Sequence, residues 1–184
     1  GIGMVHQHFM LVPVFSVYEN VVLGVEPVSG PGIMNRKKAR TEVREISERY
    51  GLAVDPDAMV EDLPVGIQQR VEIIKVLFRG ARTIILDEPT AVLVPQEVEQ
   101  LFSALAELKR EGLTVIFISH KLDEVLSVAD EITVIRGGTT VTTVRPADVP
   151  VMRIDFPVRS IPSSTSSVVD VASNVVMSTS CRTN

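Results

Sequence analysis

Residues 83–91 of this 184-residue chain read TIILDEPTA, a short apolar run that ends in two adjacent carboxylates. The run has the character of a buried strand, and Pro89 cannot continue a central strand. The strand therefore carries Asp87 and Glu88 at its carboxyl end. In an open α/β sheet that edge is where ligands bind, so the pair is placed for chemistry. An ordinary strand-to-loop junction with solvated acids is the alternative.

Apolar periodicity on both sides of this stretch indicates strands that alternate with helices. The expected strands lie at 1–5, 83–86, 114–118 and 132–135. Apolar residues at helical spacing predict three longer helices. The first begins after Asn35 as its N-cap, the second after Gly66, where free backbone N–H groups are expected, and the third at Pro95 in its first turn. A short helix is expected at 122–126. This alternation predicts a parallel sheet and an α/β fold.

Composition and charge limit the classes of partner. With 45% hydrophobic and 22% charged residues, the chain has the composition of an ordinary globular domain. A net charge of −5 disfavours a broad nucleic-acid surface, and we interpret the basic run at 36–40 as a solvated helix face rather than a phosphate site. The single cysteine, Cys181, excludes an internal disulfide. No apolar run reaches the ~20 residues of a membrane-spanning helix.

Both ends of the chain depart from the alternation. Gly1 leads straight into strand-like sequence without an initiator methionine, so we expect an N-terminal truncation. His6 and His8 would share one strand face, but without a third ligand they are weak evidence for a metal site. Residues 160–184 are rich in Ser, Thr and Val without a helical or strand period. This predicts a poorly ordered segment, or one foreign to the fold.

Four segments together resemble the nucleotide-binding domains of ABC transporters. VHQHF around Gln7, LPVGIQQRV at 63–71, ILDEPTA at 85–91 and FISH at 117–120 occur in the order of the Q-loop, signature motif, Walker B motif and switch histidine. The chain looks most like the first ATP-binding domain of tandem-domain importers of nucleosides and simple sugars.

This resemblance implies a fold and a division of the chain. The expected fold is a partial P-loop NTPase fold of ABC type over 1–145, with a mostly parallel sheet. A helical subdomain would span about 14–80, and 146–184 would be a divergent, poorly ordered tail.

The resemblance also implies roles for individual residues. Asp87 and Gln7 would hold Mg²⁺. Glu88 would be the base that polarises the attacking water at the γ-phosphate of ATP, and His120 would reach that water and the phosphate. The signature residues would face the nucleotide of a partner domain: Pro64, Val65, Gly66, Ile67 and Gln68. Read singly, Gln7 and His120 could equally be an exposed polar residue and an ordinary strand-end histidine.

Two motifs depart from the family pattern, and a third is missing. The signature lacks the Ser and Gln of the usual LSGGQ, so the resemblance implies a weak nucleotide site where this segment faces a partner domain. Residues 91–94 lack the aspartate usual after the Walker B motif, which argues against communication between the two nucleotide sites. The sequence contains no Gly-Lys dipeptide and therefore no phosphate-cradling GxxxxGK[ST] loop. We expect weak or no ATP binding by these residues alone. Without the strand and helix of that loop, we also expect the strand that ends at Asp87 to lose neighbours and the chain to expose apolar surface.

The function implied is an ATP-hydrolysing subunit of a nucleoside or simple-sugar importer, peripheral at the cytoplasmic face of the cell membrane. Its partners would be permease subunits, a second nucleotide-binding domain and, indirectly, a solute-binding protein, but no nucleic acid. Two alternatives stay open: a soluble ABC ATPase that acts on ribosomes or DNA, and an inert or regulatory truncated fragment. Acidic composition disfavours the first, and the missing phosphate loop favours the second.

Overall fold

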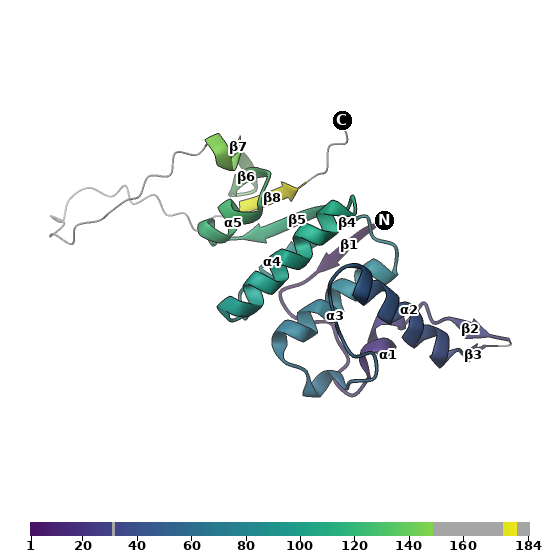
Figure 1. The fold of residues 1–184 in the computed structure, drawn as a ribbon. Coiled ribbons are helices and arrows are strands. Elements are labelled where there is room, and N and C mark those ends of the chain that lie inside the picture. Colours follow the sequence, from purple (N-terminus) through teal and green to yellow (C-terminus); the bar gives the residue numbers. More distant parts are fainter. Residues whose placement is uncertain (31, 149–174, 180–184) are drawn as a thin grey trace, which may run out of the picture.

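A six-stranded sheet runs through the molecule, with helices gathered on one side of it (Figure 1). The structure is a computed structural model that describes residues 1–30, 32–148 and 175–179. Its strands lie in the order β1-β4-β5-β8-β6-β7. Their bounds are β1 Ile2–Val5, β4 Thr83–Asp87, β5 Thr114–Ser119, β8 Val175–Thr179, β6 Glu131–Arg136 and β7 Thr139–Val144. All four strands expected from the sequence are present.

The sheet is mixed, but the predicted parallel arrangement holds for its expected strands. β1 pairs parallel with β4, and β4 parallel with β5. β8 is antiparallel to both β5 and β6, so β6 runs in the same direction as β5. β7 closes the edge as an antiparallel partner of β6. The sequence analysis did not anticipate β7, whose Thr/Val run follows a tight Gly137-Gly138 turn.

The expectation that the strand ending at Asp87 loses neighbours is wrong, because β4 is paired on both sides. β1 lies on one side of β4 with Val5 opposite Leu86, and β5 lies on the other with Ile118 opposite Asp87. Because both edges of β4 are hydrogen-bonded, its carboxyl end is held inside the sheet rather than at an open edge.

The last part of the chain contributes one strand to this sheet. β8 pairs with Val115–Ser119 on one side and with Glu131–Val134 on the other. The sequence analysis predicted no strand here. A 3-10 turn, Pro146–Asp148, follows β7. Residues 149–174 and 180–184, the rest of the expected tail, lie outside the described residues.

Three helices and a small hairpin precede β4, and the three helices pack on one another. They are α1 Val17–Val22, α2 Arg36–Arg49 and α3 Val65–Phe78, with the hairpin β2 Val28–Ser29 and β3 Ile33–Met34 and a 3-10 turn at Val60–Asp62. α2 begins as predicted, because Asn35 Oδ1 accepts a hydrogen bond from the backbone N–H of Lys38 at 2.9 Å. α4 Pro95–Arg110 and α5 Leu122–Val128 follow the strands β4 and β5.

The sequence analysis missed α1 because this helix has no solvent-facing stripe. Its buried residues are Val17, Tyr18, Asn20, Val21 and Val22. A helix that is buried on most sides shows no 3.6-residue alternation of polar and apolar positions. The short segment therefore reads as an irregular mixture of residues.

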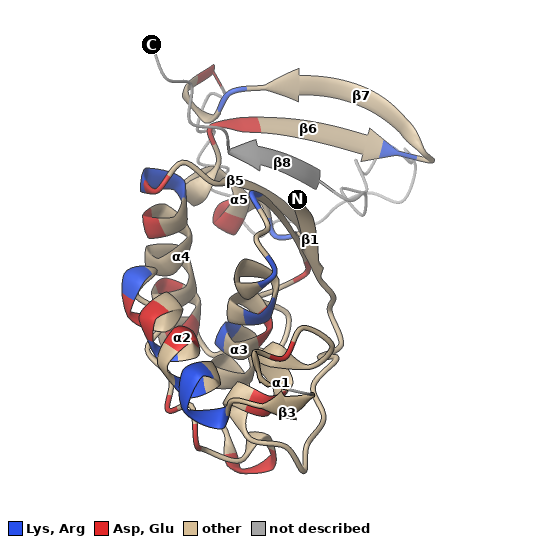
Figure 2. Cartoon of the chain, turned by 90° about the vertical axis from the view of Figure 1, so that its right-hand side faces the viewer, with Lys and Arg blue, Asp and Glu red and all other residues tan. Residues whose placement is uncertain are grey.

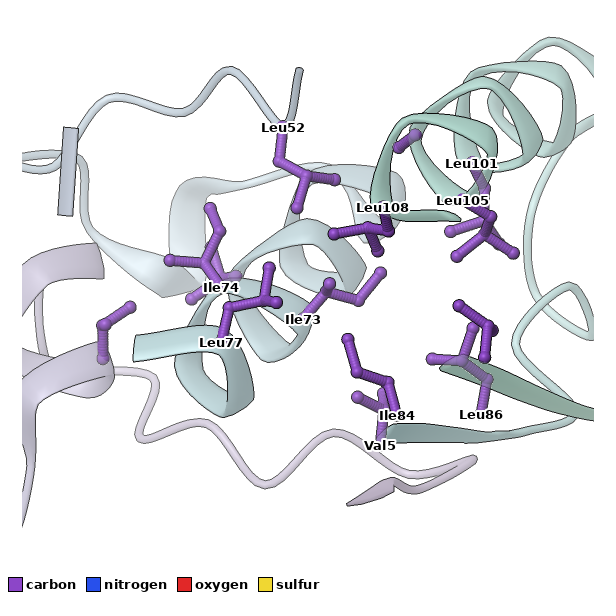
Figure 3. Packing of buried hydrophobic residues seen from close by; sticks show 14 of the residues in the cluster. Val5, Leu52, Ile73, Ile74, Leu77, Ile84, Leu86, Leu101, Leu105 and Leu108 are labelled. Carbon is purple, nitrogen blue, oxygen red and sulfur yellow. The ribbon is translucent and has the colours of Figure 1, made fainter. Parts of the chain in front are cut away.

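Side chains from α3, α4, β1 and β4 build the core between the helices and the sheet (Figure 3). Ile73 and Leu77 of α3 and Leu105 and Leu108 of α4 are among the core side chains in this view, together with the fully buried Ile84 of β4. The rings of Phe102 and Phe117 meet edge to face at a centroid distance of 5.9 Å. The apolar stripe predicted for α4 is therefore the face that covers the sheet.

One close contact between β1 and α3 requires glycine. A Cβ atom at Gly3 would lie 2.7 Å from Cβ of Val76 and 3.1 Å from Cβ of Ala81. Real Cβ atoms do not approach so closely, so α3 packs directly on the backbone of β1 at this point. This contact ties the helices of residues 17–78 to the strand that leads to Gln7.

Charged side chains lie mainly on the helices, with both signs mixed (Figure 2). In the basic run at the start of α2, Arg36, Lys37 and Lys38 are exposed. Arg40 pairs with Asp57 and lies over the Tyr18 ring, 4.5 Å from its centroid. These contacts agree with the interpretation of this run as a solvated helix face.

Candidate functional site: the carboxyl end of β4 and β5

The parallel pairing of β4 and β5 brings Glu88 and His120 together. β4 ends at Asp87 and β5 ends at Ser119, and the register places Asp87 opposite Ile118. Each next residue therefore leaves the sheet at the same edge. Nδ1 of His120 lies 2.9 Å from Oε1 of Glu88, so that an Nδ1–H donates to the carboxylate.

The turn that carries Glu88 is backbone-strained and anchored. Glu88 has φ +46°, the only positive φ of a non-glycine residue in the described part of the chain. Such a conformation costs roughly 1–3 kcal/mol and persists only where its surroundings fix it. The Glu88 N–H donates to the Ile118 carbonyl at 2.9 Å, and the Ala91 N–H donates to the Glu88 carbonyl at 3.1 Å. The chain thus turns sharply at the residue whose carboxylate meets His120.

The Glu88 carboxylate is enclosed, whereas the histidine reaches solvent. The side chain of Glu88 is 14% exposed and that of His120 is 59% exposed. Oε1 of Glu88 is engaged by His120, but Oε2 is buried and accepts no hydrogen bond from the described residues. A buried carboxylate oxygen is costly to leave unpaired. Oε2 of Glu88 therefore lacks, among the described residues, the hydrogen bond that a buried carboxylate oxygen normally accepts.

Asp87 and Gln7 lie at the same edge of the sheet. Asp87 is half-buried at the end of β4, and Gln7 is exposed in the loop that follows β1. The register Val5–Leu86 places the two chain exits side by side. Oxygen ligands of this kind suit Mg²⁺. Among the described residues, no group of three or more His, Cys, Asp and Glu side chains could hold a metal ion, so Asp87 and Gln7 could supply only part of its shell.

The predicted signature residues surround the start of α3, away from the Glu88–His120 pair. Pro64 is the N-cap of α3, and Gly66 lies in its first turn rather than before it. Gln68 is turned inward, because its Nε2 donates to the Leu63 carbonyl at 2.9 Å. None of the hydrogen bonds of the described residues joins this segment to Glu88 or His120.

A carboxylate from α4 occupies the first turn of α3. The Gly66 N–H donates to Oε1 of Glu97 at 3.2 Å, and the Val94 N–H donates to Oε2 of the same carboxylate at 3.2 Å. A Cβ atom at Gly66 would lie 2.5 Å from Glu97 Oε1, so glycine permits this approach. Glu97 thereby links the signature segment to the loop after β4. The sequence analysis missed this residue, whose only signal is its place in the first turn of α4.

Residues 1–91 match the family model described as ABC transporter. The chain carries part of an ATP-binding domain of this family. It is 54% identical over 148 residues to the nucleoside import ATP-binding protein NupA of Lactococcus lactis subsp. cremoris (strain MG1363), covering 80% of this chain and 29% of the relative. It is 51% identical over 143 residues to the guanosine import ATP-binding protein NupO of Bacillus subtilis (strain 168), covering 78% of this chain and 28% of the relative.

The fold of this ABC chain agrees with solved ATP-binding cassettes. The structure of cbiO1 from Clostridium perfringens, part of the ABC transporter complex cbiONQ, superimposes with a TM-score of 0.66 at 30% identity. The match covers 79% of this chain and 57% of that one. The ADP conformation of the cassette MJ1267 gives a TM-score of 0.65 at 26% identity, over 79% of this chain and 61% of that one. The prediction of a partial P-loop NTPase fold of ABC type is confirmed.

The ABC chain spans less than a third of the length of the curated relatives it matches. Its residues fit a magnesium nucleotide in part. Asp87 and Glu88 offer carboxylate oxygens, of which Glu88 Oε2 is buried with no partner among the described residues, and His120 contacts Glu88. The GxxxxGK[ST] loop that cradles phosphates is not in the sequence.

Proposed function

We propose that these residues belong to the ATP-hydrolysing subunit of an ABC importer of nucleosides or simple sugars. The observation that carries the proposal is the Glu88–His120 pair, in which an enclosed carboxylate keeps one oxygen free while a partly exposed imidazole holds the other. The names of the relatives, which are import ATP-binding proteins for nucleosides and guanosine, support the choice of transported solute.

In this proposal Glu88 is the general base. Its Oε2 accepts the proton of the attacking water, and the hydrogen bond from His120 Nδ1 fixes the direction of the carboxylate. A general base must lie within hydrogen-bond reach of the proton that it takes, and a fixed carboxylate meets that requirement with little reorganisation. His120 is exposed enough for its other ring nitrogen to contact a phosphate oxygen.

Asp87 and Gln7 are the residues that would hold Mg²⁺, and the signature segment 64–68 would face a nucleotide bound by a second domain. Bound Mg–ATP would supply the phosphoanhydride bond and its charge neutralisation. The free energy would drive closure of two nucleotide-binding domains against permease subunits at the cytoplasmic face of the membrane, with a solute-binding protein acting on the far side. No helix among the described residues has the length and apolarity to cross a bilayer, so in this proposal the permease subunits provide the membrane path.

The test starts from the coding DNA upstream of the Gly1 codon. An in-frame GxxxxGK[ST] within a few dozen codons would supply the phosphate loop, and the complete protein would then be assayed for ATP hydrolysis. We expect Glu88→Gln to lower kcat by roughly 100-fold or more, because a positioned base contributes about 10²–10⁴ to the rate. Glu45→Gln, which neutralises an exposed acid on α2, is the matched control.

Three results would contradict the proposal. A start codon directly before Gly1 would leave the chain without a phosphate loop and would favour an inert or regulatory role. Unchanged turnover in Glu88→Gln would remove the carboxylate from the reaction. Stimulation of turnover by RNA or DNA, in a protein that stays in the soluble fraction without detergent, would favour the ribosome- or DNA-directed ATPase.

A further inference from the structure

We infer that Thr90, Lys121 and Glu124 form a clamp that positions the Glu88–His120 pair. The inference rests on the proposed function, since it concerns how that pair is held. Glu124 and Lys121 belong to the N-terminal part of α5 and its cap, whereas Thr90 belongs to the turn after β4. The Thr90 clamp, as we name these three residues, connects two segments that are separated by more than thirty positions in the chain.

The polar side-chain groups of the clamp bond to one another. The Thr90 hydroxyl donates to Oε2 of Glu124 in a short hydrogen bond. Nζ of Lys121 donates to Oε1 of Glu124 at 3.0 Å and to the Thr90 carbonyl at 3.2 Å. The hydroxyl and the backbone carbonyl of Thr90 are therefore both hydrogen-bonded to residues of α5 and its N-cap.

Burial strengthens the contact between Thr90 and Glu124. Thr90 is fully buried and the Glu124 side chain is 17% exposed, whereas the Lys121 side chain is 38% exposed. Hydrogen bonds to a charged group are stronger than neutral ones, and they are screened less when water is excluded. The hydrogen bond between the buried Thr90 hydroxyl and the Glu124 carboxylate is thus a specific tertiary contact rather than an incidental surface contact.

The clamp lies next to both members of the catalytic pair. Thr90 is two residues after Glu88, and Lys121 is the residue after His120. On the sheet side the pair is anchored by the bond from Glu88 N–H to the Ile118 carbonyl at 2.9 Å. The Thr90 clamp is the corresponding anchor on the α5 side. With both anchors in place, the Glu88 and His120 side chains have little freedom to separate.

The conformation of Glu88 supplies the reason for a second anchor. A non-glycine residue with φ +46° relaxes toward a negative φ unless its neighbours prevent it. Relaxation at Glu88 would turn its side chain away from His120. Because the clamp fixes the backbone carbonyl of Thr90, it blocks that relaxation. Thr90, Lys121 and Glu124 contact neither Glu88 nor His120 through the hydrogen bonds described here, so they are positioning residues.

The experiment compares Thr90→Val, which removes only the hydroxyl at nearly constant volume, with Thr90→Ser, which retains it. In the complete protein, we expect the amides of Glu88 and Ala91 to exchange with solvent roughly tenfold faster in Thr90→Val, the size of effect expected for one lost charge-assisted hydrogen bond. We expect kcat for ATP hydrolysis to fall by about the same factor with KM unchanged. Thr90→Ser should restore both values.

Ser127→Ala is the matched control. It removes the 2.7 Å bond from Ser127 Oγ to the Glu124 carbonyl on the same helix but leaves the clamp intact. If Thr90→Val fails to fold, Glu124→Gln takes its place, since it keeps the size of the side chain and removes its charge. The clamp is overturned if Glu88 and Ala91 exchange at the wild-type rate in the clamp variant, or if Ser127→Ala accelerates them equally.

The exchange measurement separates this inference from the proposed function, because it needs no ATP. Faster exchange at Glu88 together with unchanged turnover in Glu88→Gln would support the clamp and refute the role of Glu88 as the general base. Normal exchange in Thr90→Val together with a large loss of turnover in Glu88→Gln would do the reverse.

Discussion

Asn20→Ala should destabilise the protein far more than an ordinary polar substitution. Asn20 is 1% exposed and lies in α1. Its Oδ1 accepts a hydrogen bond from the Val12 N–H at 2.7 Å. Its Nδ2 donates to the carbonyls of Val12 at 3.0 Å and Ser16 at 3.1 Å, with a longer contact to Phe15. One side chain therefore holds the loop that joins β1 to α1.

The expected loss is about 2–4 kcal/mol, because three well-formed hydrogen bonds each contribute about 1 kcal/mol and their partners are left partly buried. The higher helix propensity of alanine returns only about 0.5 kcal/mol. For a urea m-value of about 2 kcal/mol/M, the unfolding midpoint would fall by roughly 1–2 M.

Asn35→Ala is the comparison variant in the same urea titration. Asn35 makes one side-chain bond, to the Lys38 N–H at the exposed start of α2, and its loss should cost about 1 kcal/mol. If Asn20→Ala lowers the midpoint no more than Asn35→Ala does, the reasoning from buried hydrogen bonds is refuted. A native amide exchange pattern at Val12 in Asn20→Ala would refute it as well.

Two further predictions concern packing and pH. Gly3→Ala should lower the free energy of unfolding by about 1–3 kcal/mol, the usual effect of overpacking, because its Cβ would meet the Cβ atoms of Val76 and Ala81; Val76→Ala in the same chain keeps the Cβ of residue 76 and should recover little of the loss, and a full recovery would argue against this contact. The pKa of Glu19 is lowered by hydrogen bonds from the backbone N–H and then the hydroxyl of Ser16. A carboxylate whose pKa is depressed in the folded state stabilises at pH above its unfolded pKa and loses that effect as the pH falls through the folded pKa. Wild type should therefore exceed Glu19→Gln in stability at neutral pH, and the difference should disappear in acid; a difference that stays constant down to acid pH would contradict this.

Local patterns were sufficient for much of the fold. The expected strands and the helices that start near Asn35, Gly66 and Pro95 are all present. These elements have caps, breakers or one-sided apolar stripes, which are properties of a few neighbouring residues. α1 escaped prediction because it is buried on most sides. β8 escaped it because its strand character depends on pairing with β5 and β6, which are remote in the chain.

At the candidate site, too, local sequence patterns predicted some residues, whereas others are recognised only from tertiary contacts. The buried strand that ends in two acids was enough to single out Asp87 and Glu88, because residues that follow such strands emerge at one edge of a parallel sheet. His120 was singled out by the resemblance to the switch histidine of ABC domains. Thr90 and Glu124, which we infer to position the Glu88–His120 pair, were given no role from the sequence: Thr90 lies in the ILDEPTA segment next to the acids, and Glu124 lies in an ordinary short helix.

Residue identity and short-range periodicity therefore specify which segments become strands and helices, and which acids end a strand. The positive φ of Glu88, the free Oε2 oxygen and the contact with His120 arise only when β4 and β5 lie side by side. These properties depend on the burial and register of segments far apart in the chain. No local pattern encodes them, because their free energies come from contacts that form only in the folded sheet.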